Sequence, residues 1–383
     1  RNPVFNYEYN QDPRYSEKLG ELSQLSADID DCTTTHAVVK RLYQAKIEEK
    51  KKLLQLVRAS AQMTNKFEDD HESAAATFLS CTEEVFGKVT PELFNGVVET
   101  LLTKIANNQN YVPENNKSHD EFVATLEQIT GREFKSYRAQ TEVDSAAPAR
   151  IVDKQDEIKK RFEEALRKNS LHDWRVELGH KKRSAFGVKF KKKTIVIPNQ
   201  TALSARKLGS ALTEKKLEAL IEHELTHVLR YENGLGSKLK LLSVGLAENF
   251  PGEEGYALYR ERLITGDAEF ASTALCFAAG VASGLDGKGK KDFRGVFEVL
   301  RLYYETVHLG QDIRPDYVAF RSCASLFKGT QGDISGVYLT IPIAYREGHM
   351  RISSLLDVRP DLIARGLIGK YDITNPSHTQ ALQ

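Results

Sequence analysis

The sequence of 383 residues has no apolar run that approaches the roughly twenty residues needed to cross a bilayer. Its longest apolar run, residues 274–282, is far shorter and ends at Ser283-Gly284. The chain also lacks a signal-like apolar segment and begins at Arg1 rather than at a methionine. We therefore expect a cytoplasmic protein without a membrane segment, and a chain trimmed at its N-terminus.

Cysteine is scarce and scattered. No two of the four cysteines have the spacing of zinc ligands; they are Cys32, Cys81, Cys276 and Cys323. This pattern argues against a structural zinc cluster and against a disulfide scaffold. We expect buried free thiols in a reducing compartment.

Neither sign of charge dominates, because 54 basic residues face 53 acidic ones. The charge of the whole protein therefore names no partner. The stretch Gly284–Lys291 is rich in glycine and lysine but lacks the spacing of a phosphate-binding loop, so we expect a surface turn there. No aromatic residues interleave with basic ones as in a nucleic-acid groove, and nucleic acid is not expected as a partner.

The length of the chain predicts two or three domains. In residues 1–150, apolar residues recur every three or four positions over 15–29 and 37–60, which predicts an N-terminal helical region. Polar residues fill 107–120 and 140–149, where we expect loops or linkers.

The pattern changes after residue 150. A charged amphipathic helix is predicted at about 151–168. Three short strands follow, at 174–178, 185–190 and 194–197. We expect residues 151–383 to form a second domain, and the whole protein to have a mostly helical α+β fold with one small sheet.

The run Ile221–Leu229 contains the pattern His-Glu-x-x-His, with His223, Glu224 and His227. Chance would give this pattern in only about two chains in a hundred of this composition. Residues four apart lie on the same face of a helix, so the two imidazoles can share one zinc ion. Glu224 lies next to them and can act on a water molecule as general base.

The helix that carries this pattern is predicted to begin after Thr213 as its N-cap and to run to Tyr231. Asn233-Gly234 then marks its end. The strand that precedes it is expected to border the substrate cleft and to pair with an extended peptide.

A catalytic zinc site of the peptidase type needs a third protein ligand. Downstream of His227, the segment that begins at Pro251 has the composition of a helix start and carries Glu253 and Glu254. One of these two carboxylates is the expected ligand, as in the gluzincin class of metallopeptidases. Gly255 beside them would let the two helices approach closely.

These residues resemble the family of tyrosine carboxypeptidases that includes the microtubule-associated and the bacterial QEGLA-motif proteins. The resemblance is carried by the zinc helix, Glu253–Ala257, Asn2–Tyr7, Leu42–Glu48 and Tyr345–Ile352. It implies a gluzincin-like zinc metallopeptidase fold, one Zn²⁺ ion, and release of a C-terminal tyrosine or other aromatic residue from a peptide or protein tail.

The resemblance also implies roles for single residues. In that family the glutamate immediately before the glycine is the metal ligand, which corresponds to Glu254. Tyr345 is the candidate for a further donor to the oxyanion, with a structural tyrosine as the alternative. Lys328 and Arg351 are the candidates for binding the substrate.

Two departures from the family pattern stand out. The family often spaces its histidines one residue further apart, and the shorter spacing here needs no local widening of the helix. Where the family tends to place two arginines, this chain has Ser325 and Lys328, and a lysine lacks the bidentate fork that suits a carboxylate.

Basic residues crowd around the predicted strands: Lys181, Lys182, Arg183, Lys189, Lys191, Lys192 and Lys193. Such a rim would attract an acidic peptide tail, although a solvated hairpin explains it as well. Other hypotheses for the chain are a zinc aminopeptidase, an endopeptidase, and a zinc-binding scaffold without catalytic activity.

Overall fold

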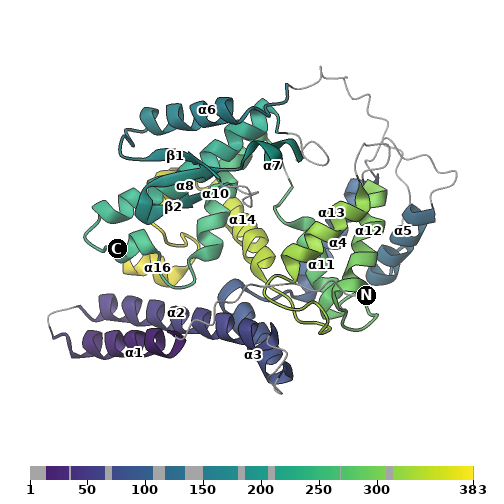
Figure 1. The fold of residues 1–383 in the computed structure, drawn as a ribbon, viewed down its shortest axis with the longest axis horizontal. Helices are drawn as coiled ribbons and strands as arrows, with labels where there is room; N and C mark the ends of the chain where they lie inside the picture. Colours follow the sequence, from purple (N-terminus) through teal and green to yellow (C-terminus); the bar gives the residue numbers. More distant parts are fainter. Residues whose placement is uncertain are drawn as a thin grey trace. The chain divides into compact units, whose positions relative to one another are not determined.

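The computed structural model describes residues 14–33, 36–64, 71–106, 117–133, 150–179, 186–205, 212–267, 269–307 and 314–382. Helices make up most of these residues, and the strands form one small sheet, as the sequence predicts (Figure 1). Within the part of the chain that the structure describes, none of the helices combines the length and apolar character of a bilayer span.

The chain folds into two compact units, each built from two separate stretches. Residues 1–140 and 271–346 form the first unit, and residues 141–270 and 347–383 form the second. This division differs from the predicted boundary at residue 150. The reason is packing: helices from residues 273–326 share one buried core with helices from the N-terminal region.

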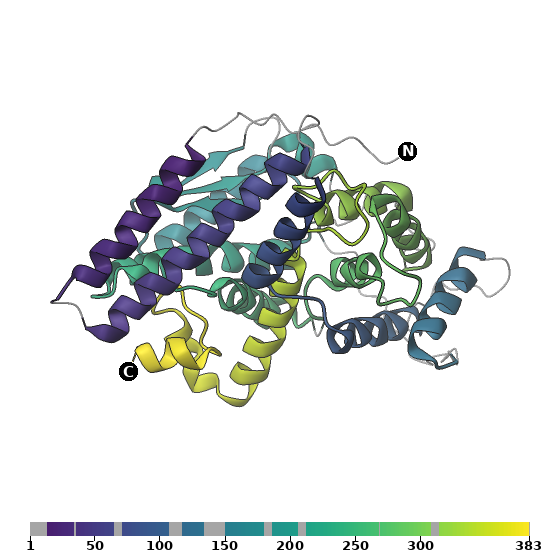
Figure 2. The same cartoon turned by 90° about the horizontal axis from the view of Figure 1, so that it is seen from below.

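The first unit is helical. Its helices are α1 (Tyr15–Asp31), α2 (Ala37–Thr64), α3 (His71–Phe86), α4 (Pro91–Ala106), α5 (Lys117–Thr130), α11 (Thr273–Ser283), α12 (Phe293–Val307), α13 (Pro315–Leu326) and the start of α14 (Ile341–Val358). Helices α1 and α2 confirm the two predicted N-terminal helices and lie side by side (Figure 2). Helix α5 begins inside the predicted loop at 107–120; residues 107–116 and 140–149 lie outside the described residues.

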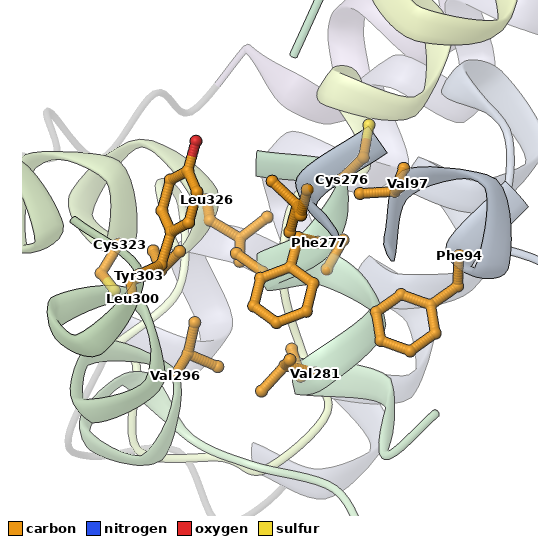
Figure 3. Close-up of a cluster of buried hydrophobic side chains, with 14 of the residues drawn as sticks. Phe94, Val97, Cys276, Phe277, Val281, Val296, Leu300, Tyr303, Cys323 and Leu326 are labelled. Carbon is orange, nitrogen blue, oxygen red and sulfur yellow. The ribbon is translucent and has the colours of Figure 1, made fainter. Parts of the chain in front are cut away.

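Aliphatic and aromatic side chains together fill the core of the first unit (Figure 3). The ring of Phe277 stacks on Phe94 at 5.8 Å between centroids and meets the ring of Phe122 edge-on at 5.7 Å. All four cysteines are free, and Cys276 and Cys323 are buried in this core. The prediction of buried free thiols is therefore confirmed for Cys81, Cys276 and Cys323, whereas Cys32 is only partly buried.

The second unit contains the sheet. Its elements are α6 (Gln155–Lys168), β1 (Arg175–Leu178), β2 (Gly187–Lys189), the 3₁₀ turn η1 (Phe190–Lys192), β3 (Thr194–Ile197), α7 (Gln200–Ala205), α8 (Glu214–Gly236), α9 (Leu241–Val244), α10 (Phe250–Thr265), the rest of α14, the 3₁₀ turn η3 (Pro360–Leu362), α15 (Ile363–Gly366) and α16 (Pro376–Ala381). The strands thus lie within the three predicted segments.

Strand β3 lies in the middle of the sheet, parallel to β1 and antiparallel to β2. All four of its residues are buried. The expectation that this strand pairs with an extended peptide is therefore wrong, because both of its edges are already paired. That the strand borders the substrate cleft stays a prediction. β1 and β2 form the edges of the described sheet.

Two faces of helix α8 pack against different partners. Leu217, Leu225 and Val228 lie in a buried cluster with residues of α6 and of the strands. His223, His227, Arg230 and Gly234 recur three or four residues apart and therefore lie on one stripe. Contacts with α9, α10 and the C-terminal segment come from this stripe.

The predicted end of α8 at Asn233-Gly234 is wrong, because the helix continues to Gly236. Its start is confirmed, since the side chain of Thr213 accepts a bond from the amide of Lys216. A Cβ on Gly234 would lie 2.5 Å from the backbone of Leu242. Gly234 thus allows α9 to approach α8 closely, and it does not end the helix.

Gly255 also serves a close approach, but its partner differs from the expected one. A Cβ there would meet the backbone of Gly348 in α14 at 2.2 Å, and a Cβ on Gly348 would meet the carbonyl oxygen of Pro251 at 1.9 Å. Helices α10 and α14 therefore touch backbone to backbone. This contact fixes the part of α10 that carries Glu253 and Glu254.

We predict that Gly348→Ala destabilises the protein by about 1–3 kcal/mol or more, because the added methyl group must push α14 away from α10. Gly236→Ala is the control: its Cβ would meet no atom within 4 Å. It should be neutral or slightly stabilising, since alanine favours a helix. Thermal unfolding of both variants checks this, and equal shifts in melting temperature would contradict the packing argument.

Candidate metal centre

The two predicted histidines and Glu254 converge on one point of the second unit. The Nε2 atoms of His223 and His227 lie 3.3 Å apart, and each lies 3.6 Å from Oε2 of Glu254. All three side chains are almost completely enclosed. The group can therefore hold a metal ion, as the sequence predicts.

The spacing of these three atoms fits a small ion. A point equidistant from corners 3.3, 3.6 and 3.6 Å apart lies about 2 Å from each, and Zn²⁺ takes nitrogen and oxygen ligands at about 2.0–2.2 Å. Three protein ligands leave one coordination position for water or substrate. Among the described residues, the donor set thus has three members, one fewer than a closed structural zinc site.

Local sequence places the ligands on their helices. His223 and His227 are separated by one turn of α8, so their rings stand above one another. Helix α10 begins after Asn249 with a proline near its start, and Glu254 follows in its second turn. Because α8 and α10 pack against each other, the carboxylate of Glu254 faces both imidazoles.

Glu253 is brought to the same site but has a different partner. Its Oε1 lies 2.8 Å from Nδ1 of His227, on the side of the ring away from the converging Nε2 atoms. Arg230 and Lys370 also hold this carboxylate, at 3.1 and 3.3 Å. Glu253 therefore orients a histidine, and Glu254 offers the oxygen that joins the two Nε2 atoms.

His223 has a comparable neighbour that sequence reasoning missed. Oε2 of Glu261 lies 3.2 Å from Nδ1 of His223, in ion-pair range but without hydrogen-bond geometry. Glu261 stands two helical turns after Glu254, so the seven-residue spacing was an available signal. Arg230 was likewise signalled by its place one turn after His227, whereas nothing in the sequence points to Lys370.

Nearby carboxylates raise the pKa values of both histidines of the group. Burial lowers the pKa of His223, but Glu254, Glu261 and Glu224 outweigh it and raise the pKa to about 10. Burial likewise lowers the pKa of His227, and Glu254 and Glu253 raise it to about 9. These values describe the protein without metal.

The carboxylates shift in the opposite direction. Burial raises the pKa of Glu254, but His227 and His223 lower it to about 2. Burial also raises the pKa of Glu253, but Arg230, Lys370 and His227 hold it far below its usual range. The metal-free group is therefore a set of paired opposite charges at neutral pH.

Glu224, the candidate base, is buried on α8 beside His223. It contributes to the raised pKa of that histidine, which places its charge near the ligand group. Its role as the base stays a prediction.

The other predicted residues are not among the three candidate ligands. Lys328, Ser325 and Tyr345 belong to the first unit, and the roles of Lys328 and Tyr345 stay predictions. Arg351 belongs to the second unit, is half exposed, and donates a bond of 3.1 Å to Asp372.

The basic rim is partly neutralised. Lys193 pairs with Asp173 and Glu232, and Lys189 lies 3.7 Å from Glu177. Lys191 and Lys192 are exposed, whereas residues 181–183 lie outside the described residues. An acidic tail would therefore meet fewer available charges than the sequence suggests.

The comparisons with known proteins give no relative: no family model matches the chain, and neither a curated protein nor a solved structure is significantly similar to it. The residues and their geometry therefore carry the functional inference.

We predict that Glu254→Gln abolishes stoichiometric metal binding, because the amide is a far poorer ligand for a divalent ion. Glu261→Gln removes only a neighbour of His223 and should weaken binding by about 10–100-fold at most. Metal content after gel filtration, measured by mass spectrometry, distinguishes the two. Equal retention of metal by both variants would remove Glu254 as a ligand.

Metal binding should also release protons. The surrounding carboxylates raise the pKa values of His223 and His227, so the metal-free pair holds an extra proton at neutral pH, which must leave when an ion binds. Apparent affinity should therefore rise with pH, by up to about tenfold per pH unit for each proton released. Calorimetry in buffers of different ionisation enthalpy measures the number released, and zero protons would contradict this charge assignment.

The same shifts predict how metal-free stability depends on pH. A histidine whose pKa is raised on folding stabilises the fold fully below the unfolded value of 6.5. This contribution is lost as the pH rises through about 9 and 10. Unfolding of chelator-treated protein should become easier over this range.

Proposed function

We propose that the protein is a zinc-dependent peptidase. The observation that carries this proposal is the convergence of two imidazole nitrogens and one carboxylate oxygen beside a buried glutamate from the same helix. Such a donor set leaves one position open, which suits hydrolysis better than a purely structural role.

The metal would supply two things: it lowers the pKa of water to about 7, and it polarises the scissile carbonyl. The chain supplies the rest. Glu224 takes a proton from the attacking water and delivers one to the leaving amine. Glu253 keeps the ring of His227 oriented by a hydrogen bond at Nδ1, so that its Nε2 stays available. Glu261 supplies negative charge beside Nδ1 of His223.

For the substrate we propose a peptide or protein tail that ends in tyrosine or another aromatic residue. This rests on the resemblance of the motifs to tyrosine carboxypeptidases. Arg351 is the candidate for binding the terminal carboxylate, since its exposed guanidinium matches the geometry of such a group. On the same resemblance, Lys328 is a further candidate for binding the substrate, and Tyr345 is the candidate for a further donor to the oxyanion.

A zinc aminopeptidase is the second candidate. It needs an acidic group to hold the substrate amine, and Glu261 is a partly exposed carboxylate beside His223. The two candidates differ in which end of a peptide is shortened. A binding scaffold would not need Glu224, so the complete set of four residues favours an enzyme over it.

Glu224→Gln should keep its metal but lose peptidase activity by a factor of about 10²–10⁴, because the amide cannot accept the proton. Measuring metal content and turnover on the same sample separates the two effects. Glu222→Gln is the matched control: this neighbouring side chain pairs with Arg260 and faces no ligand in the structure described. Activity of Glu224→Gln equal to that of the wild type would remove Glu224 as the base.

Digestion of a peptide library with mass readout tests the substrate class. We expect loss of a C-terminal aromatic residue, and no loss after treatment with a chelator. Shortening from the N-terminus would favour the aminopeptidase, and internal cleavage would contradict both exopeptidase candidates.

A further inference from the structure

A buried cation lies close to the metal-ligand group although it cannot bind a metal. Lys370 belongs to the segment between α15 and α16. Its Nζ lies 3.3 Å from Oε1 of Glu253 and 3.4 Å from the centre of the Phe190 ring. Burial lowers the pKa of Lys370, whereas the carboxylate of Glu253 opposes this and favours the charged ammonium group. The aromatic face favours the same charged form.

The same carboxylate oxygen serves the lysine and a histidine. Oε1 of Glu253 lies 2.8 Å from Nδ1 of His227 and 3.3 Å from Nζ of Lys370. Positive charge on this oxygen weakens the negative field that reaches the imidazole. Lys370 therefore acts on His227 through Glu253, and its own charge repels a divalent ion at the site.

The position of Lys370 is firmly held. Nε of Arg230 donates to the carbonyl of Gly369 at 2.9 Å, and a second guanidinium nitrogen donates to the carbonyl of Tyr371. The amide of Lys370 bonds to the carbonyl of Leu242, and its own carbonyl accepts from the amide of Leu246. Backbone bonds on both sides of the lysine thus direct its side chain toward Glu253.

We propose that Lys370 is a positioning residue that limits the metal affinity of the group formed by His223, His227 and Glu254, and that stabilises the protein while the metal is absent; this rests on the metal centre of the proposed function. Four carboxylates surround the two histidines: Glu224, Glu253, Glu254 and Glu261. Without metal, this negative charge requires buried cations. With metal, the same cations oppose the ion.

The inference predicts effects of opposite sign for two variants. Lys370→Met removes the charge and keeps the contact between Glu253 and His227, so metal affinity should rise by ~10-fold or more. Glu253→Gln removes the carboxylate and leaves Lys370 and Arg230 unpaired, so affinity should fall by about 10–100-fold. A merely structural role would lower the affinity in both variants.

The measurement is a competition titration of Zn²⁺ against a chromophoric chelator at one pH, with thermal unfolding of the metal-free proteins. Lys370→Met should melt at a lower temperature without metal, and Lys370→Arg should restore the wild-type affinity. Arg262→Met is the control, because it breaks an ion pair of α10 with Asp357 and should leave the affinity unchanged. If Lys370→Met fails to fold, Lys370→Gln makes the same comparison.

Unchanged or reduced affinity in the folded Lys370 variant would overturn the inference while the metal centre stands. A wild-type protein that binds no metal would overturn both. Metal binding with the predicted opposite shifts, but without peptide hydrolysis, would support the inference and remove the proposed function.

Discussion

Burying a carboxylate costs free energy unless cations or hydrogen-bond donors surround it, and Glu253 is such a buried carboxylate in the second unit. It is met by Arg230 from α8, by His227 from the same helix and by Lys370 from the C-terminal segment. Helix α8, helix α10 and the C-terminal segment thereby meet at the side chain of Glu253. The orientation of the metal-ligating histidine depends on this meeting.

Helix α8 can serve both the core and the site because its two stripes do not mix. The apolar stripe with Leu217, Leu225 and Val228 belongs to the buried cluster of the sheet and α6, which fixes the rotation of the helix about its axis. That rotation turns His223 and His227 toward α10. The direction in which His223 and His227 point is thus fixed by the packing of the opposite face of α8.

Gly255 and Gly348 fix the position of α10 through its contact with α14. Close contact between Gly255 and Gly348 lets two backbones touch, and this sets where Glu253 and Glu254 stand along the helix. Adjacent residues of a helix point about 100° apart, so one carboxylate faces both Nε2 atoms while the other reaches Nδ1 of His227. Two neighbouring glutamates therefore have different tasks.

Much of this could be predicted from the sequence. The helices, the three strands and the candidate ligands His223, His227 and Glu254 follow from patterns that repeat within a few residues, because helix and strand periodicity is a local property. The predicted end of α8 is wrong because Gly234 allows the backbone of Leu242 to approach the helix, instead of ending it. A tertiary contact of this kind produces no local sequence pattern. The same holds for β3, whose central place in the sheet depends on β1 and β2; both strands precede it along the chain, and each pairs with one of its edges.

What the sequence by itself determined is the chemistry on offer: two imidazoles one turn apart, a neighbouring base, and a pair of carboxylates at a helix start. Only the tertiary structure decided which carboxylate faces the imidazole nitrogens, and that Arg230, Glu261 and Lys370 stand around them. It also joined residues 271–346 to the N-terminal helices, because buried aromatic side chains pack by shape and not by order along the chain. Side-chain spacing within a helix is encoded locally, whereas the balance of buried charges exists only once distant segments have met.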